Sequence, residues 1–442
     1  MGDISRKAFE NLLIWKNNPK RKVLLIRGAR QVGKTYLARK LGREFKNFIE
    51  INLVEQANLK SVFETGNLDP NKILESISAY FAQSIEDGQT LLFIDEIQAC
   101  PEAITALRFF YEKRPNLHVL ATGSLLEFAL EEISSFGVGR VEYLYLYPLS
   151  FNEFLISQGE DSLIEEIKKA KPLAEVLHLK ALSLLKLFLQ LGGLPEVHVL
   201  YASSRDLLLC SRLMSTLLAN YEDDFSKYKK RLSVEALAET LRSTSLQTGK
   251  KFIYSHAYRD AKVKTVSKAL SLLVKAGLVH QVFHSSANGI PLGAELDTGK
   301  FKVIPLDIGI FNRLSGLQIS DLAMLNALDL INKGALVEMF VGLEIINSGD
   351  NSCKESLYYW HREAKSSNAE LDYILQVGQK IVPIEVKASS KGSMQSMHAF
   401  IKEKKIKLGI RTSTENFSEY DKIKVVPLYA ISEIRRIIDS ES

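Results

Sequence analysis

The chain has 442 residues, of which 46% are hydrophobic and 25% are charged. At about 100–200 residues per domain, this length predicts two to four domains, and the composition excludes a fibrous, collagen-like or mainly disordered protein. The three cysteines lie far apart and form no CxxC pair, which fits a reducing cytosol and argues against a structural zinc site. Because the chain has no apolar signal region near its start and no apolar run of about 18 residues, we expect a cytoplasmic protein without a membrane-spanning helix.

The positive charge of the chain is concentrated in one segment. The formal net charge is +5, but residues 226–275 contain 12 Lys+Arg and 3 Asp+Glu, a local net charge of +9 that leaves −4 for the rest. A basic segment in a slightly acidic chain predicts a surface that binds a polyanion such as nucleic acid. A solvated helix face or a domain interface is the alternative explanation.

The first 155 residues alternate between apolar, strand-like runs and helical patterns. Continuous apolar runs are typical of strands that are buried on both faces of a parallel sheet. The alternation therefore predicts an α/β domain with a doubly wound parallel sheet over residues 1–155. The strand-like runs are residues 22–27 (KVLLIR), 48–53 (FIEINL), 90–94 (TLLFI) and 117–122 (LHVLAT).

Two further segments follow this domain. Residues 156–228 are rich in Leu, Lys and Glu at helical spacing, and we expect a helical connector or lid there. Residues 229–325 predict short helices, one of them capped by Thr265 and ended by Gly277, and then a two-stranded hairpin. This order of elements predicts a winged helix-turn-helix domain. The helix is expected at residues 266–276 and the two strands at residues 279–283 and 301–306.

Residues 326–442 show a different α/β pattern and are expected to form a separate domain. A helix over residues 335–346 precedes three strand-like runs, and Gly378 marks the turn between the second and third. A helix, two more strands and a last helix complete the pattern. The strand-like runs are residues 357–361, 371–376, 380–387, 407–411 and 424–429.

The strongest chemical signal is GARQVGKT, residues 28–35, which matches GxxxxGK[ST] between a predicted strand and a predicted helix. Its glycines let main-chain N–H groups surround a phosphate, and the start of the following helix adds positive potential. We expect Lys34 to reach the β- and γ-phosphates and the hydroxyl of Thr35 to bind Mg²⁺. The predicted nucleotide-binding residues here are Gly28, Ala29, Arg30, Gln31, Val32, Gly33, Lys34, Thr35 and Tyr36.

A second signal is LLFIDE, residues 91–96, which places two carboxylates at the end of an apolar strand. Ligands of α/β sheets bind at the carboxyl ends of the strands. We expect Asp95 to bind Mg²⁺ together with Thr35, and Glu96 to polarise the attacking water as general base. Alone, this run would be an ordinary surface Asp-Glu pair, and the upstream glycine loop favours the functional interpretation.

A third, weaker signal is ATGS, residues 121–124, at the end of another buried strand. A polar side chain there, Thr122 or Ser124, is expected to contact the γ-phosphate or to position the water. A simple strand-ending turn is an equal alternative.

One arginine is a candidate for action across a subunit boundary. Arg140, in FGVGR, follows the core strands and is the candidate arginine finger. Arg108 and Arg114 are alternatives, and a surface salt bridge is the other explanation for each of the three.

The motifs resemble those of a group of bacterial and archaeal AAA-type ATPases. The resemblance rests on GARQVGKT, LLFIDEIQ, ATGS, GR…PLSFNEFL, GGLPEV and LLVKAGLV, and it covers nearly the whole chain. It implies an N-terminal AAA+ core that binds ATP or ADP with Mg²⁺, then a winged helix and a restriction-endonuclease-like fold catalogued as a domain of unknown function. AAA-type ATPases often complete their site with a neighbouring subunit, so the resemblance also implies a homo-oligomer.

A second constellation lies near the C-terminus. Glu385 and Lys387 lie on one face of an expected strand, because side chains alternate along a strand, and a hairpin at Gly378 brings Asp372 beside them. The set is similar to the PD-(D/E)XK nuclease arrangement, with Glu338 as the acid on the preceding helix. That similarity implies a second Mg²⁺ or Mn²⁺ on Asp372 and Glu385, with Lys387 stabilising the hydroxide or the developing charge. The alternatives are a cross-strand salt bridge, or a nuclease fold that only binds DNA or a neighbouring domain.

The basic segment centres on the predicted helix at residues 266–276. Such a helix can enter a major groove while its lysines neutralise phosphates. Few residues suited to bidentate base contacts lie among the lysines, so we expect mainly backbone contacts. If the helix packs against the ATPase core instead, the lysines are only solvated. The candidate DNA contacts are Lys250, Lys251, Lys262, Lys264 and Lys268.

The sequence favours a Mg²⁺-dependent AAA-type ATPase that binds or remodels DNA through its C-terminal half, with metal-dependent DNA cleavage left open. The alternative is a nucleotide-controlled switch or scaffold, whose C-terminal fold docks a protein partner and has no nuclease activity. The expected domains are residues 1–155, 156–228, 229–325 and 326–442.

Overall fold

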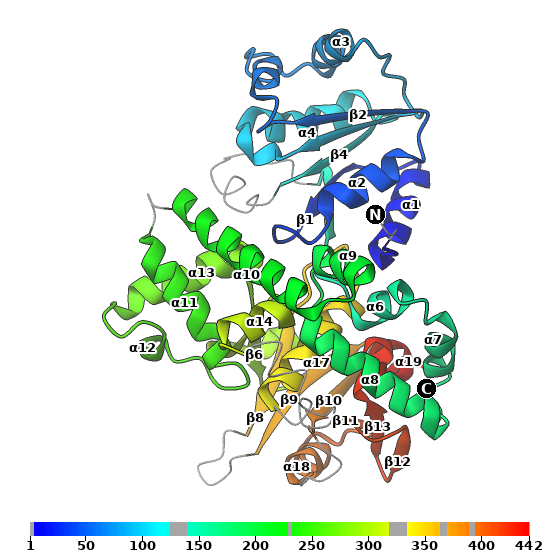
Figure 1. Cartoon of the computed structure of the whole chain (residues 1–442), viewed down its shortest axis with the longest axis vertical. Coiled ribbons are helices and arrows are strands. Elements are labelled where there is room, and N and C mark those ends of the chain that lie inside the picture. The colour runs from blue at the N-terminus through cyan, green and yellow to red at the C-terminus, as the bar shows by residue number, and fades with distance from the viewer. Residues whose placement is uncertain are drawn as a thin grey trace. The chain divides into compact units, whose positions relative to one another are not determined.

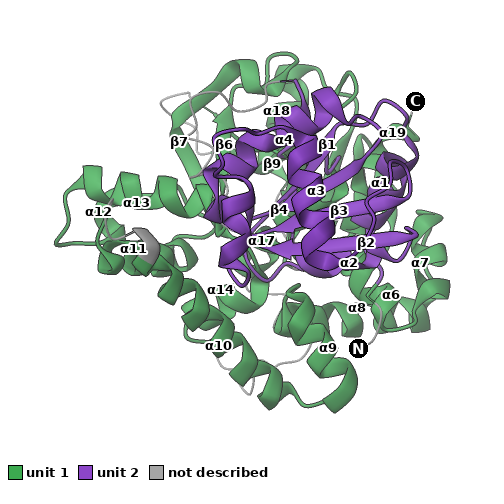
Figure 2. Cartoon of the chain, turned by 90° about the horizontal axis from the view of Figure 1, so that it is seen from above, with its two compact units in different colours: residues 1–4, 148–349, 355–442 green, residues 5–147, 350–354 purple. Residues whose placement is uncertain are grey.

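The computed structural model describes residues 4–123, 139–228, 232–317, 334–362, 369–388 and 394–441 (Figure 1). The chain divides into two compact units, which Figure 2 shows in different colours. The N-terminal unit consists of residues 5–147 together with residues 350–354. The C-terminal unit consists of residues 1–4, 148–349 and 355–442.

The N-terminal unit contains a five-stranded sheet in which all neighbouring strands are parallel, in the order β2-β3-β4-β1-β5. Four of these strands were expected from apolar runs. The edge strand β5 was not, because Glu142 and two tyrosines interrupt its apolar pattern and leave it partly exposed. The strands are β1 (Val23–Arg27), β2 (Asn47–Asn52), β3 (Thr90–Asp95), β4 (His118–Thr122) and β5 (Val141–Tyr145).

Helices cover both faces of this sheet, so the prediction of a doubly wound parallel sheet is confirmed (Figure 1). On one face, α3 and α4 pack against Leu25, Ile51 and Ile94 in a common apolar core. On the other face, the end of α2 lies against the ring of Phe48, which stacks on Phe93. The helices are α1 (Lys7–Asn17), α2 (Lys34–Gly42), α3 (Pro70–Phe81) and α4 (Pro101–Lys113), with short 3₁₀ turns at Ala57–Val62 and Ile97–Ala99.

The parallel sheet brings distant parts of the sequence to one edge. The central strand β3 is buried along its whole length, as its continuous apolar sequence predicts. The loop after β1, the acidic pair after β3 and the last residue of β4 all lie at the carboxyl ends of neighbouring strands. Ligands of open α/β sheets bind at this edge.

The C-terminal unit begins with a helical segment, as expected for residues 156–228. A capping box starts α6, in which Ser150 and Glu153 each accept the other's main-chain N–H. The rings of Phe151, Phe154 and Phe188 pack together behind it. The helices are α6 (Phe151–Ser157), α7 (Asp161–Lys168), α8 (Glu175–Leu191), α9 (Pro195–Ser204) and α10 (Leu207–Asp224), followed by a 3₁₀ turn at Phe225–Tyr228.

A glycine pair separates α8 from α9, and its second member, Gly193, has no room for a side chain. A Cβ there would lie 2.5 Å from the carbonyl oxygen of Leu149. The carboxylate of buried Asp307 accepts the N–H of Gly193 at 2.5 Å and that of Ile310 at 3.0 Å, which caps α14 (Ile308–Leu314). The GGLP part of the motif GGLPEV is therefore a structural junction.

Three helices precede an antiparallel pair of strands in residues 232–317, as expected; the winged-helix assignment itself stays a prediction. The prediction that Thr265 caps the third helix is wrong. Lys262 is the N-cap residue, and the N–H of Thr265 already donates to the carbonyl of Lys262 at 2.8 Å within the first turn. The elements are α11 (Val234–Leu246), α12 (Tyr254–Ala257), α13 (Val263–Lys275), β6 (Val279–Ser285) and β7 (Leu296–Pro305), with a 3₁₀ turn at Leu292–Glu295.

The β6–β7 hairpin belongs to a larger sheet. β6 also pairs in parallel with β8, so an eight-stranded mixed sheet continues across residue 326, in the order β12-β13-β11-β10-β9-β8-β6-β7. β9 and β10 form the expected antiparallel hairpin around Gly378. The further strands are β8 (Leu357–His361), β9 (Glu370–Val377), β10 (Lys380–Val386), β11 (Gly409–Ser413), β12 (Ser418–Tyr420) and β13 (Ile423–Pro427).

Helices pack on both faces of this second sheet. Met397 and Phe400 of α18 share a core with Ile374 of β9. The neighbouring residue Tyr373 points to the opposite face, because side chains alternate, and its hydroxyl donates to the carbonyl oxygen of Glu338 on α17 at 2.8 Å. The helices are α17 (Gly334–Ser348), α18 (Gln395–Lys404) and α19 (Ile434–Asp439), with a 3₁₀ turn at Leu428–Glu433.

Candidate functional site

The loop between β1 and α2 has a backbone that favours glycine. Gly28, Gln31 and Gly33 have φ angles of 149°, 67° and 96°, which few side chains tolerate. A Cβ on Gly28 would also overlap the carbonyl oxygen of Leu146. Among the other predicted loop residues, Ala29 and Val32 are buried, Arg30 is exposed, and Tyr36 is half-buried on α2.

Lys34, the first residue of α2, turns its side chain into this loop. Its ammonium donates to the carbonyl oxygens of Gly28 at 3.0 Å and Ala29 at 2.7 Å. Burial lowers the pKa of Lys34 to about 8, against the opposing effect of the Glu96 and Asp95 carboxylates. An anion bound in the loop would favour the charged ammonium again.

The structure brings the three predicted polar residues Thr35, Asp95 and Thr122 together. The hydroxyl of Thr35 donates to Oδ2 of Asp95 at 2.8 Å, and the hydroxyl of Thr122 donates to Oδ1 through a short hydrogen bond. Asp95 is 6% exposed and Thr122 is fully buried. The carboxylate is therefore held between two neighbouring strands and the start of α2.

These donors suit a magnesium ion. Mg²⁺ in proteins prefers oxygen ligands and is usually held by one or two carboxylates or hydroxyls together with phosphates. The hydroxyl of Thr35 and the carboxylate of Asp95 are hard oxygen donors in direct contact with each other. The residues present therefore fit the ion that the glycine loop predicts.

Glu96 has an unusual backbone conformation directly after β3. Its φ is 50° and its ψ is 43°, a left-handed conformation that costs a non-glycine residue energy and is often found at functional sites. Its side chain is half-buried and accepts a short hydrogen bond from the amide of Gln98. Glu96 therefore has a fixed orientation beside Asp95, at the same edge of the sheet as Lys34.

The remaining predicted residues of this site are less informative. Ser124 lies outside the described residues. Arg140 is half-buried and forms a close ion pair with Glu112, which also pairs with Arg108 at 3.1 Å. Arg114 pairs with Asp87 at 2.7 Å. Within one chain, each candidate finger thus has an acidic partner.

Three family models match parts of the chain. Residues 20–155 match a model described as an AAA domain. This match, together with the loop geometry, makes this segment an AAA domain. Residues 182–321 and 333–431 match two models that are each described as a domain of unknown function (DUF8612 and DUF4143). These matches support the expected resemblance to AAA-type ATPases. The nuclease-like fold stays a prediction.

Two of the solved structures that are similar to this chain are distant from it in sequence. A Walker-type ATPase of Pyrococcus abyssi has 16% identity and a TM-score of 0.45, and the compared region covers 71% of this chain and 96% of that one. The Orc1 protein of Aeropyrum pernix, in complex with DNA, has 13% identity and a TM-score of 0.28 over 70% of this chain and 91% of that one. No curated protein sequence matches the chain. The assignment of the AAA domain therefore rests on the family model and the geometry of its loop.

Outside the AAA domain, the C-terminal unit gathers the four residues of the predicted nuclease-like set. Lys387 donates to Oε1 of Glu385 at 2.6 Å, and Oδ2 of Asp372 accepts the N–H of Val386 at 2.8 Å. Tyr373 pairs with Ile384, so the next residues, Asp372 and Glu385, are cross-strand neighbours. The carboxylate of Glu338, on α17, interacts electrostatically with the carboxylate of Asp372.

Lys302 and Glu370 also belong to this cluster, and neither was predicted. Lys302, on β7, is 2% exposed and pairs with Glu338 at 2.9 Å and with Glu370 at 2.6 Å. Its ammonium also lies 5.3 Å from the centre of the Tyr359 ring. We call Glu338, Glu370, Asp372, Glu385, Lys302 and Lys387 the C-terminal cluster. An apolar strand pattern that contains one lysine, FKVIP, was the only signal of Lys302 in the sequence.

Burial and like charges shift the carboxyl groups of this cluster. Burial, together with the charge of the neighbouring Asp372 carboxylate, raises the pKa of Glu338 and of Glu385 to about 7. Burial also raises the pKa of Asp372. Burial alone would lower the pKa of Lys302, but the surrounding carboxylates raise it above its usual range. Lys302 is therefore a permanent cation within the cluster.

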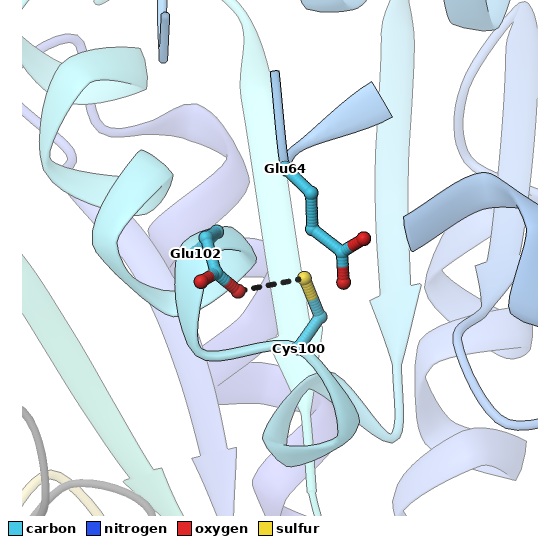
Figure 3. A group of neighbouring side chains, drawn as sticks. All are labelled: Glu64, Cys100 and Glu102. Atoms are coloured by element: carbon cyan, nitrogen blue, oxygen red, sulfur yellow. Dashed lines mark hydrogen bonds between the residues drawn. The ribbon is translucent and has the colours of Figure 1, made fainter. Parts of the chain in front are cut away.

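A different group of residues could share one metal ion by distance alone. Among the described residues, only the ligand atoms of Glu64, Cys100 and Glu102 lie within 4.8 Å of one another as a group of three (Figure 3). Both carboxylates are exposed, and Sγ of Cys100 lies 3.6 Å from Glu102. Burial raises the pKa of the Cys100 thiol to about 11, so the thiolate that a metal needs is disfavoured.

The five predicted DNA contacts are all exposed, on or near α11 and α13. None of them forms an ion pair with another described residue. Exposed apolar side chains lie among them, of which Leu246 is 65% and Val263 is 55% exposed.

The helices of the structure also bear on the membrane prediction. Among the described residues, no one helix has the length and apolar character to cross a membrane, and α8 with α9 passes only as a pair bent by 117°.

Proposed function

We propose that the chain is a Mg²⁺-dependent ATPase whose C-terminal half binds or remodels DNA. The observation that carries the ATPase part is the contact between Thr35 and Asp95 beside the lysine of the glycine loop. Two halves of a nucleotide site that lie 60 residues apart in sequence meet there. ATP or ADP is the proposed ligand.

Each residue of this site has a proposed task. Main-chain N–H groups of the loop and the ammonium of Lys34 bind the β- and γ-phosphates. Thr35 and Asp95 hold Mg²⁺, which neutralises phosphate charge when bound. Thr122 fixes the orientation of the Asp95 carboxylate. Glu96 orients a water molecule and accepts its proton.

Calorimetry with the purified chain tests nucleotide binding. The unmodified chain is expected to bind ATP with Mg²⁺, and Lys34→Ala to lose that binding, because the buried ammonium no longer offsets the phosphate charge. Lys72→Ala, which removes an exposed lysine on α3, is the matched control. Full ATPase activity of Lys34→Ala would overturn the proposed site.

Five exposed lysines that form no ion pair with any described residue support the DNA part of the proposal. Neutralising phosphates releases counterions, so affinity for DNA must fall steeply with salt. Replacing Lys262, Lys264 and Lys268 by alanine is expected to reduce the slope of log K against log salt by roughly one per lysine. Lys171→Ala and Lys422→Ala, which remove exposed lysines elsewhere, are controls. DNA is also expected to stimulate ATP hydrolysis.

A nucleotide-controlled switch or scaffold is the second proposal, and the pairing of β6 with β8 favours it. This pairing builds the hairpin into a sheet, so the hairpin is not a free wing that can enter a groove of DNA. In this proposal ATP and ADP set the conformation, and the C-terminal unit docks a protein. Slow ATP hydrolysis that no DNA changes, and no gel shift at either low or high salt, would select it.

Metal-dependent DNA cleavage is proposed as an addition to the first function. Oε2 of Glu385 is buried and has no hydrogen-bond partner among the described residues, and Lys387 lies beside the same carboxylate. Asp372 and Glu385 are the proposed ligands of Mg²⁺ or Mn²⁺. Incubating DNA with either ion and comparing the chain with Asp372→Ala tests this. Identical products from both would remove the cleavage proposal.

A further inference from the structure

Lys302 divides the C-terminal cluster into two parts. Its buried ammonium pairs with Glu338 at 2.9 Å and with Glu370 at 2.6 Å. Both carboxylates therefore already have a cation, and a divalent ion beside Glu338 would have to displace or repel a buried ammonium. Lys302 lies on β7, 36 residues before Glu338.

The other part of the cluster keeps free acceptor capacity. Oε1 of Glu385 accepts from Lys387, but Oε2 of the same carboxylate is buried without a partner, and Glu385 is only 7% exposed. Asp372 uses Oδ2 to accept the N–H of Val386. Tyr373 pairs with Ile384, so the next residues, Asp372 and Glu385, are cross-strand neighbours whose carboxylates are close enough to share one ion.

The cluster carries an excess of negative charge. Four carboxylates and two ammonium groups leave an excess of two negative charges when all are ionised. Lys302 pairs with Glu338 and Glu370, and Lys387 pairs with Glu385, so neither ammonium balances the carboxylates around it. One divalent ion with oxygen ligands would complete the balance.

We propose that Lys302 takes the place of a second metal ion, so that the C-terminal cluster binds one divalent ion, through Asp372 and Glu385, and Glu338 is not a metal ligand. The inference rests on the proposed metal-binding role of this cluster and specifies it. Lys302 is a positioning residue here, because it fixes Glu338 and Glu370 and does not itself contact the metal.

Counting bound Mn²⁺ by electron paramagnetic resonance, with the full chain and without nucleotide or DNA, tests the proposal. All variants carry Asp95→Asn, which removes the metal ligand of the AAA domain. The starting chain is expected to bind one Mn²⁺ that Glu385→Gln and Asp372→Asn abolish and that Glu338→Gln keeps. Lys302→Met is expected to bind a second Mn²⁺, because Glu338 and Glu370 become free.

Two further variants control for misfolding of Lys302→Met. Lys302→Met leaves the carboxylates of Glu338 and Glu370 without their cation, and the double variant Lys302→Met, Glu338→Gln removes the more buried of these two charges. The double variant is expected to fold and to return to one Mn²⁺. Lys300→Met, which removes a half-exposed lysine two residues away on the same strand, is the matched control and keeps one.

Other counts would overturn the inference. Loss of the first ion in Glu338→Gln would show that Glu338 is a metal ligand. A single ion in folded Lys302→Met would show that Lys302 does not replace a second metal ion. No Mn²⁺ in the starting chain, with one in Lys302→Met, would mean that Lys302 excludes metal altogether. These counts do not depend on ATP hydrolysis or DNA binding, so they separate this inference from the proposed ATPase and DNA functions.

Discussion

Thr35, at the start of α2, donates its hydroxyl to Oδ2 of Asp95, at the end of β3, across 2.8 Å. Thr122 donates to the other oxygen of the same carboxylate from the end of β4. A carboxylate held on both oxygens has little freedom to rotate. The orientation of Asp95 is thus set by two hydroxyl groups that lie far from it in sequence.

Removing the Thr122 hydroxyl should slow ATP hydrolysis more than it weakens ATP binding. Thr122→Val leaves Oδ1 of Asp95 without its buried donor, and a hydrogen bond to a charged group contributes about 1.5–3 kcal/mol. We expect kcat to fall about 10-fold or more. Thr122→Ser keeps the hydroxyl and should keep most of the activity. Equal activity in both variants, with ATP affinity measured in parallel, would show that Thr122 has no such role.

Glu96→Gln should bind ATP and hydrolyse it very slowly. The amide cannot accept a proton, and a general base contributes roughly 10²–10⁴-fold to the rate. Single-turnover measurements of bound ATP check this. Glu102→Gln removes an exposed carboxylate from the first turn of α4 and should leave the rate unchanged. A normal rate in Glu96→Gln would exclude Glu96 as the base.

Arg140 should act on the site of a neighbouring subunit. Arg140→Ala is expected to bind ATP normally and to lose up to about 10³-fold in kcat. Mixing it with Glu96→Gln should restore part of the activity, because some interfaces then join an intact Glu96 with an intact Arg140. Arg108→Ala and Arg114→Ala are the matched controls. A mixture as inactive as its components would refute Arg140 as the finger.

Asp307→Ala should destabilise the C-terminal unit. The variant leaves the buried N–H groups of Gly193 and Ile310 without an acceptor, at a cost of about 1–3 kcal/mol for each unsatisfied group. Urea denaturation followed by tryptophan fluorescence measures the loss. Asp206→Ala, which removes a half-buried cap of α10, should cost about 1 kcal/mol. Equal losses would mean that Asp307 is an ordinary cap.

The N-terminal unit should lose stability in weak acid because of His118. Its ring packs edge-on against Trp15 and Phe45, and burial lowers its pKa from 6.5 to about 4. The unfolded chain takes up this proton more readily than the folded chain, so stability is complete above the unfolded pKa and falls as the pH drops from about 6.5 to about 4.

The melting temperature at several pH values measures this effect. His118→Gln should show a smaller decrease between about pH 7 and about pH 5 than the unmodified chain. His256→Gln, which removes an exposed histidine of α12, should show the unmodified decrease. If His118→Gln is as sensitive to acid as the unmodified chain, another group causes the loss.

Much of the nucleotide site could be predicted because its signals are local. The spacing of Gly28, Gly33 and Lys34 encodes a loop conformation within eight residues, and the apolar run before Asp95 predicts a buried strand that ends there. The parallel sheet then brings both to one edge without further information. β5 was not predicted because an edge strand has one exposed side and its apolar pattern is broken.

The C-terminal cluster could be predicted only in part. The Asp372, Glu385 and Lys387 spacing is local to one hairpin, and the structure pairs these strands as expected. Glu370 was not predicted because, two residues before Asp372, it cannot be distinguished in the sequence from an ordinary solvated charge. Thr265 was taken for a cap because its residue type suits one, whereas the backbone begins the helix three residues earlier.

The sequence by itself determined the residues of the glycine loop, four of the five strands of the first sheet and the acidic end of β3, since each depends on neighbours a few residues away. Only the tertiary structure decided that β6 joins β8 and that Lys302 enters a cluster of carboxylates from α17 and β9. A buried lysine gains its stability from charges that are distant in the chain, and no local pattern encodes which carboxylates will surround it.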